Sequence, residues 1–133
     1  MNTAELRKVR KLRVLLAEDS PLHQRVAQAM LERQGHCVTV ASNGREVLEA
    51  VLRQQFDAVL MDIEMPEIDG LKAAQMIRKL EGDIQPRLFL IALTSTESPE
   101  ECLEAGMDAF LAKPLDPGLL ARILRHVAHR SVA

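Results

Sequence analysis

Three acidic residues and one lysine stand directly after short apolar runs of this 133-residue chain. Glu18 and Asp19 follow the first run, Asp62 follows a second, and Lys113 follows a third. If these runs are parallel strands of one sheet, their carboxyl ends meet at one edge and bring the four side chains together. Clustered carboxylates repel one another unless a cation joins them, so the pattern predicts a divalent metal site. The lysine adds a second positive charge, which favours a site that takes up a phosphoryl group.

Apolar segments of strand type alternate with amphipathic helical segments along the whole chain. The expected strands are Arg13–Ala17, Cys37–Ala41, Ala58–Met61, Arg87–Leu93 and Ala109–Ala112. The first, third and fourth are apolar on successive residues, as strands covered by helices on both faces are. This alternation predicts an α/β fold, a flavodoxin-like (βα)5 three-layer sandwich with a parallel sheet of order 2-1-3-4-5. That order places the acidic residues of the first and third strands at the ligand-binding edge.

Helix starts and helix faces can also be predicted. A capping residue precedes a proline at Ser20-Pro21, Ser98-Pro99 and Asp116-Pro117, and capping-box spacing joins Asn43 to Glu46 and Ser98 to Glu101. Apolar residues then recur with a period near 3.6. The expected core-facing positions are Leu22, Val26, Ala29 and Met30 in the first helix and Leu120, Ile123, Leu124 and Val127 in the last.

The composition is that of a soluble globular domain, with 47% hydrophobic and 27% charged residues. Seventeen basic against 19 acidic residues give a net charge of −2, and Trp and Tyr are absent, so nucleic-acid binding is not expected. No apolar run approaches membrane-spanning length, which predicts a cytoplasmic domain without membrane contact, whether or not its parent protein is anchored in the inner membrane. Cys37 and Cys102 have no metal or redox spacing and are expected to be reduced thiols.

Four motifs together resemble the receiver domain of two-component response regulators. The matching segments are Leu15–Asp19, Val59–Pro66 with Asp69-Gly70, Ala92–Ser95 and Phe110–Pro114. The resemblance implies a receiver domain over residues 12–130, with residues 1–11 as a linker or N-terminal extension. The amino-acid sequence of several segments is most similar to that of receivers of hybrid sensor histidine kinases. We therefore expect either a domain cut from such a protein or a stand-alone regulator.

The resemblance also implies roles for the residues at the sheet edge. Asp62 corresponds to the phosphoacceptor, a carboxylate that attacks phosphorus when positive charge neutralises the phosphoryl oxygens. Asp19 and Asp62 would bind Mg²⁺ directly, together with the backbone carbonyl of Glu64, while Glu18 acts through water; Mn²⁺ is a second candidate. Lys113 would pair with a phosphoryl oxygen, and in the family its bond to the following proline, here Pro114, is cis.

Thr94 and Phe110 correspond to the switch pair of the family. Phosphorylation would draw the Thr94 hydroxyl toward the phosphoryl group and let Phe110 rotate inward, although packing alone also explains an aromatic residue on a strand. This movement would change the surface of the fourth helix, the fifth strand and the fifth helix. Glu64 and Thr96 flank the site and influence how fast the phosphate is lost, and the small Ser95 leaves room beside Thr94.

The expected phosphodonor is a phosphohistidine on a histidine kinase or a histidine phosphotransfer domain. The switched surface would then contact a downstream effector or another domain of the same protein, and the chain by itself would turn over no external substrate. Two alternatives stay open: a Mg²⁺-dependent phosphohydrolase with Asp62 as nucleophile, and an interaction module that is never phosphorylated. The four histidines are expected to be surface residues, with His126 and His129 on a solvated helix face and His23 and His36 elsewhere.

Overall fold

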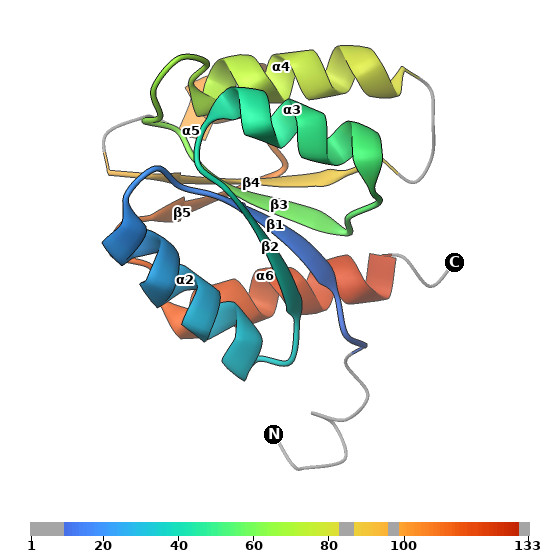
Figure 1. The fold of residues 1–133 in the computed structure, drawn as a ribbon. Helices are drawn as coiled ribbons and strands as arrows, with labels where there is room; N and C mark the ends of the chain where they lie inside the picture. The colour runs from blue at the N-terminus through green and yellow to red at the C-terminus, as the bar shows by residue number, and fades with distance from the viewer. Residues whose placement is uncertain (1–9, 83–86, 96–98, 131–133) are drawn as a thin grey trace.

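The computed structural model describes residues 10–82, 87–95 and 99–130. Its parallel strands form one sheet of order β2-β1-β3-β4-β5, with helices on both faces (Figure 1). The strands are β1 (Arg13–Ala17), β2 (Cys37–Ala41), β3 (Ala58–Asp62), β4 (Phe89–Thr94) and β5 (Ala109–Ala112). The helices are α2 (Pro21–Arg33), α3 (Gly44–Arg53), α4 (Gly70–Glu81), α5 (Pro99–Glu104) and α6 (Pro117–Arg130). The predicted fold class and strand order are confirmed.

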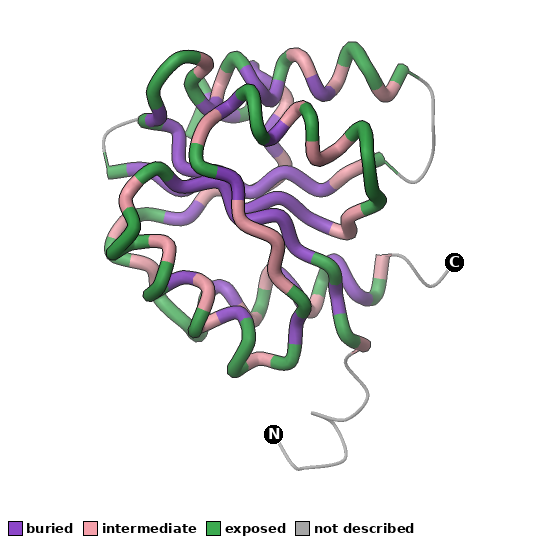
Figure 2. Tube along the Cα trace, in the orientation of Figure 1, coloured by how far each residue is buried: buried purple, intermediate pink, exposed green. Residues whose placement is uncertain are grey.

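The sheet is covered on both faces because its central strands are apolar on both faces. Every residue of β3 is buried, and the central strands are buried along most of their length (Figure 2). Val59 and Met61 pack into the layer formed with α3, α4 and α5, whereas Ala58 and Leu60 pack into the layer formed with α2 and α6. Strands buried on both sides are typical of parallel sheets, and this burial fixes which strand ends share an edge.

Two strands differ from the predicted bounds at their ends. β4 begins at Phe89 rather than Arg87, because the backbone N–H of Leu88 donates to the Glu81 carboxylate at 2.6 Å instead of joining the ladder. At the other end, Asp62 and Thr94 belong to the ladder as the last residues of β3 and β4. Both side chains are therefore fixed by regular sheet structure rather than by a loop.

The predicted core face of α2 is wrong for Leu22, Val26 and Ala29, which are exposed, and right only for Met30, which packs at the edge of the core, whereas the predicted face of α6 is confirmed. Leu22 and Val26 are 67% and 52% exposed, and the buried residues of α2 are Ala27 and Leu31. Apolar residues run round more than half of this helix, so periodicity alone fits two faces, and packing on the sheet selects the other one. The predicted face of α6 is buried at Leu120, Leu124 and Val127, with Ile123 packed at its edge.

The predicted helix caps are present where the structure describes them. The hydroxyl of Ser20 accepts the His23 N–H at 3.4 Å, and the Asn43 side chain accepts the Glu46 N–H at 2.9 Å. Asp116 accepts the N–H groups of the first turn of α6, whereas Ser98 lies outside the described residues. Among the helices described, none has the length and apolar character needed to cross a bilayer.

Candidate functional site

The carboxyl ends of β1 and β3 bring three acidic side chains together. One carboxylate oxygen from each of Glu18, Asp19 and Asp62 lies within 4.8 Å of the others. β1 and β3 are neighbours in register, with Ala17 opposite Met61, so the residues that follow these two share one edge. Glu18 and Asp62 are buried, whereas Asp19 is exposed. Solvent therefore reaches the cluster at Asp19, while Glu18 and Asp62 are shielded from it.

Lys113 reaches the same cluster from β5. Its Nζ lies 2.8 Å from Oδ2 of Asp62 and 4.0 Å from Oε2 of Glu18. The other oxygen of Asp62, Oδ1, accepts the backbone N–H of Glu64 at 2.9 Å. The backbone N–H of Lys113 donates to the carbonyl oxygen of Thr94 at 3.1 Å, and its bond to Pro114 is cis, as the resemblance implied. Both oxygens of Asp62 are thus held in place by groups from separate segments.

Glu18 is the least well satisfied group of the site. Burial, together with the hydrogen bond and the charge of the neighbouring Asp62, raises its pKa to about 7 against the lowering effects of the Ser20 N–H and Lys113. Its Oε1 accepts the Ser20 N–H at 3.1 Å, but Oε2 has no hydrogen-bond partner within the described part of the chain. A buried carboxylate oxygen without a donor, beside two further carboxylates, is a place for a proton or a cation.

Lys113 remains charged in this surrounding. Burial by itself lowers its pKa, but the hydrogen bond and the charge of Asp62 outweigh burial, and Glu18 and Glu64 act in the same direction. The net effect is a raised pKa, so the ammonium group is present at neutral pH. The site therefore combines a fixed cation with a cluster of three carboxylates, one of which, Asp19, is exposed to solvent.

The residues predicted to surround the site are placed as follows. Thr94 is buried at the end of β4, and Phe110 is partly buried on the neighbouring strand β5, where it packs against the layer of α3, α4 and α5. Glu64, Ser95 and Pro114 are exposed. Thr96 lies outside the described residues. The structure thus places Thr94 and Phe110 on adjacent strands, with Phe110 opposite Ala92 and with the Thr94 carbonyl oxygen bonded to the Lys113 N–H.

Two histidines have contacts that the sequence did not indicate. His23 is exposed as predicted, but its Nδ1 lies 3.5 Å from Oε1 of Glu18, because the first turn of α2 folds back over the end of β1. His36 was predicted to lie at the surface and is buried, since its Nδ1 accepts the backbone N–H of Leu12 at 3.1 Å. The proline cap at Ser20 was the signal that could have placed His23 in the turn beside the site.

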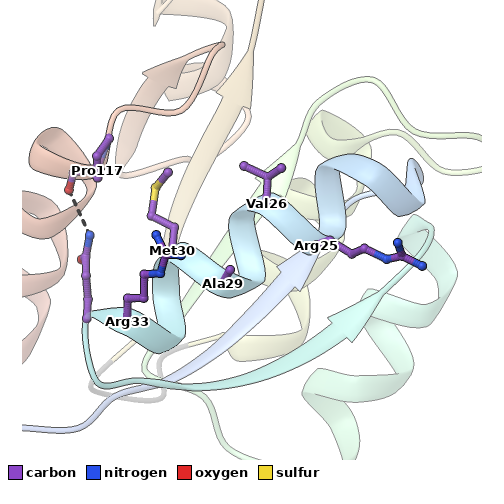
Figure 3. Close-up of a pocket in the computed structure, with 7 residues that line it drawn as sticks. Arg25, Val26, Ala29, Met30, Arg33 and Pro117 are labelled. Atoms are coloured by element: carbon purple, nitrogen blue, oxygen red, sulfur yellow. Dashed lines mark hydrogen bonds between the residues drawn. The ribbon is translucent and has the colours of Figure 1, made fainter.

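A hollow of the surface lies away from this cluster, between α2 and the start of α6 (Figure 3). The Gln34 side chain closes one end of it by donating to the carbonyl oxygen of Pro117 at 3.0 Å. Arg25, Val26, Ala29, Met30 and Arg33 form the rest of its lining. None of the predicted site residues lines the hollow.

The sequence pattern of the response regulator receiver domain matches residues 14–125. The chain belongs to this family. This receiver domain is 35% identical to probable histidine kinase 1 of Oryza sativa subsp. indica, over 80% of this chain and 14% of that protein. It is 40% identical to hybrid signal transduction histidine kinase K of Dictyostelium discoideum, over 77% of this chain and 9% of that protein. The receiver domain therefore spans only a small part of the length of these relatives.

Solved receiver domains have the same fold. The receiver domain of sensor histidine kinase PA1611 from Pseudomonas aeruginosa PAO1 is 36% identical, with a TM-score of 0.79 over 90% of this chain and 99% of that one. That structure has a magnesium ion coordinated in its active-site cleft. The receiver domain of a histidine kinase from Syntrophus aciditrophicus is 27% identical, with a TM-score of 0.80 over 91% of this chain and 92% of that one. The acidic cluster described above is thus part of a receiver domain of two-component signalling.

Proposed function

We propose that this receiver domain is the phosphoacceptor of a two-component phosphorelay and that Asp62 receives the phosphoryl group. The observation that carries the proposal is the position of the Asp62 carboxylate. It lies 2.8 Å from the Lys113 ammonium and within 4.8 Å of the carboxylates of Glu18 and Asp19. Asp19 is exposed, so solvent reaches this edge of the sheet. A nucleophile between a fixed cation and a cation site is the arrangement that phosphoryl transfer requires.

The donor set fits a hard divalent cation. Asp19 and Asp62 with the backbone carbonyl of Glu64 would hold Mg²⁺, and Glu18 would act through water; Mn²⁺ is the second candidate. The unpartnered Oε2 of Glu18 and the mutual approach of three carboxylates support this assignment. When bound, the ion supplies neutralising charge for the phosphoryl oxygens.

In the proposed reaction, a carboxylate oxygen of Asp62 forms a bond to phosphorus as the phosphorus–nitrogen bond of a phosphohistidine breaks. The imidazole leaves with the bonding electron pair and takes a proton from water. Lys113 then pairs with a phosphoryl oxygen instead of with the carboxylate. The donor is a phosphohistidine of a histidine kinase or of a histidine phosphotransfer domain, which the histidine kinases among the relatives support.

The proposal extends to the readout of the modification. Thr94, which is buried beside Lys113 in the ladder, would move toward the phosphoryl group, and Phe110 would follow on the neighbouring strand. The surface of α5, β5 and α6 would then change and contact an effector or another domain of the same protein. Residues 12–130 form the receiver domain in this proposal, residues 1–11 are a linker or an N-terminal extension, and Glu64, Ser95, Thr96 and Pro114 flank the acceptor. The domain would modify itself and would turn over no external substrate.

The test is the intact mass of the chain after incubation with Mg²⁺ and acetyl phosphate. We expect the wild type to gain one phosphoryl group, which alkaline pH removes, and Asp62→Asn to gain none. Asp69→Asn is the matched control. Asp69 caps the start of α4 by accepting the Lys72 N–H, and its replacement should leave labelling intact. Labelling of Asp62→Asn would exclude Asp62 as the acceptor.

Two further measurements separate the alternatives. Steady release of phosphate from a small ester, without an accumulated phosphoprotein, would favour the phosphohydrolase. No labelling by acetyl phosphate or by a phosphohistidine domain, together with partner binding that Asp62→Asn leaves unchanged, would favour the interaction module. Either outcome would overturn the proposed function.

A further inference from the structure

The two helices that cover one face of the sheet, α2 and α6, are strongly basic (Figure 1). Together they carry a single acidic residue, Glu32, against five arginines, which are Arg25, Arg33, Arg122, Arg125 and Arg130. Helices α3, α4 and α5 on the other face carry five basic and six acidic residues. The net charge of −2 therefore conceals one basic face, and such a face attracts acidic partners.

The arginines of α2 are not neutralised by the helix itself. Arg25 and Arg33 are both exposed, and among the residues that the structure describes no ion pair joins either of them to a carboxylate. Glu32, the acidic residue of this face, instead accepts the side-chain N–H of Gln28 at 3.5 Å. Arg33 is the last residue of α2 and lies about 15 Å along the helix axis from His23 and the acceptor site.

Two hollows between α2 and α6 meet at Gln34. The first, of about 560 Å³, is the hollow already described, with Arg33 at its rim (Figure 3). The second, of about 350 Å³, shares Arg33 and Gln34 with the first and extends to Leu124 of α6. Ala29 and Met30 supply apolar surface to the first hollow, and Leu124 supplies it to the second. We call the two hollows together the α2–α6 groove.

Gln34 supplies the second, independent observation. Its Nε2 donates to the carbonyl oxygen of Pro117 at 3.0 Å, whereas its Oε1 is buried and has no hydrogen-bond partner within the described part of the chain. Gln34 lines both hollows, so this acceptor belongs to the groove. A buried acceptor without a donor favours a ligand that brings an N–H group. A peptide brings such groups, whereas the acyl chains of a lipid bring none.

We propose that the α2–α6 groove binds an acidic amphipathic helix of a protein partner. The apolar stripe of that helix would lie on Ala29 and Met30, as helices that dock into apolar grooves do. Its acidic residues would face Arg33 on one side of the groove and Arg125 on the other. The inference goes beyond the proposed function, because this contact uses the end of α2 remote from the acceptor and needs no phosphoryl group.

The test is titration of the ¹⁵N-labelled, unphosphorylated chain with a synthetic peptide of about 18 residues that forms a helix with leucines along one face and glutamates elsewhere. We expect the amide shifts to change in residues 29–35 and 117–125. Arg33→Glu should raise the dissociation constant at least about fivefold, because a surface attraction becomes a repulsion. Arg53→Glu is the matched control, since Arg53 is exposed and ends α3 as Arg33 ends α2, and it should bind the peptide like the wild type.

Control ligands separate a docked helix from other partners. A peptide of the same composition, rearranged so that its leucines no longer share one face, should bind more weakly, and equal binding would mean that the basic face attracts any polyanion. Tighter binding to vesicles of phosphatidylserine and phosphatidylcholine, with shifts in the same residues, would assign the face to a membrane surface instead. Absence of peptide binding, or shifts spread over α3, α4 and α5, would also overturn the inference.

Discussion

Gly70 packs directly against the backbone of Asp62. A β-carbon at position 70 would lie 2.6 Å from the Asp62 carbonyl oxygen and 2.8 Å from the α-carbon of Ile63. The N–H of Gly70 also donates to the carbonyl oxygen of Ile63 at 3.0 Å. The first turn of α4 therefore closes the loop behind the proposed acceptor, with space for a hydrogen atom and nothing larger.

Gly70→Ala is expected to lower the free energy of unfolding by about 1–3 kcal/mol, because the atoms it would meet are backbone and cannot turn aside. Displacement of Asp62 should also slow labelling by acetyl phosphate. Urea unfolding followed by circular dichroism measures the first effect. Gly118→Ala is the control: its β-carbon would meet only the Asp116 side chain, at 3.2 Å, and a change below about 1 kcal/mol is expected. Equal effects of the two substitutions would contradict the prediction.

Lys113→Ala is expected to destabilise the metal-free domain by about 1–3 kcal/mol, because it leaves the buried Asp62 carboxylate beside Glu18 without its cation. Mg²⁺ should restore much of this loss, since a bound ion takes over the neutralisation and stabilises the folded state by mass action. Thermal unfolding with and without Mg²⁺ measures both effects. The exposed Lys72 provides the control variant, Lys72→Ala. A Mg²⁺ response no larger than that of the wild type would be evidence against this account.

Val26→Asp is expected to slow phosphoryl transfer from a phosphohistidine domain and to leave labelling by acetyl phosphate unchanged. Leu22 and Val26 are exposed apolar residues on the helix turn that carries His23, so a protein donor that reaches Asp62 would cover them. A charge there costs binding to the donor but touches no reacting atom. Leu52→Asp on α3, where Leu52 is 69% exposed, is the matched control. Slower labelling by both donors would mean that the substitution damages the site itself.

His36 is expected to make the domain less stable in mild acid. Burial lowers its pKa from the usual 6.5, against the opposing charge of Asp57. Nδ1 of the ring accepts the Leu12 N–H. If Nδ1 were protonated, its N–H would face the Leu12 N–H and the hydrogen bond would be lost. The unfolded chain binds this proton more readily than the folded one, and the contribution of His36 to stability is therefore lost as the pH falls below about 6.5.

Glu18 affects the pH dependence of stability in the opposite direction to His36. Its raised pKa of about 7 means that the folded state binds a proton first, so its contribution to stability increases as the pH falls. The comparison is therefore between the wild type and His36→Asn, each unfolded by urea at about pH 8 and about pH 5. We expect the wild type to lose more stability than the variant over this interval. A larger loss in the variant would show that His36 takes up its proton in the folded state.

The elements at the heart of the sheet could be predicted because burial on both faces leaves an unambiguous pattern. Continuous apolar runs at Val14–Ala17 and Ala58–Met61 have few alternatives to covered strands, and strict alternation with helices leaves few strand orders. The meeting of Asp19 with Asp62 then follows from adjacency of β1 and β3. The roles of these residues came from resemblance to a family and stay a proposal.

Tertiary contacts decide the features that could not be predicted. The exposed face of α2 is as periodic as its buried one, so only the sheet determines that Ala27 and Leu31 turn inward. The start of β4 depends on Glu81, which takes the Leu88 N–H out of the ladder. The burial of His36 depends on the backbone of Leu12, a partner 24 residues away that no local pattern indicates.

Lys113 follows β5, an edge strand that pairs with β4 alone. The position of the lysine beside Asp62 therefore depends on β5, the last strand in the sequence, and on the hydrogen bond from the Lys113 N–H to the Thr94 carbonyl oxygen. Any opening of that edge withdraws the ammonium and leaves Asp62 facing Glu18 with no compensating charge. If Asp62 is the acceptor as proposed, a molecule with its β5 edge open would therefore be a poor acceptor.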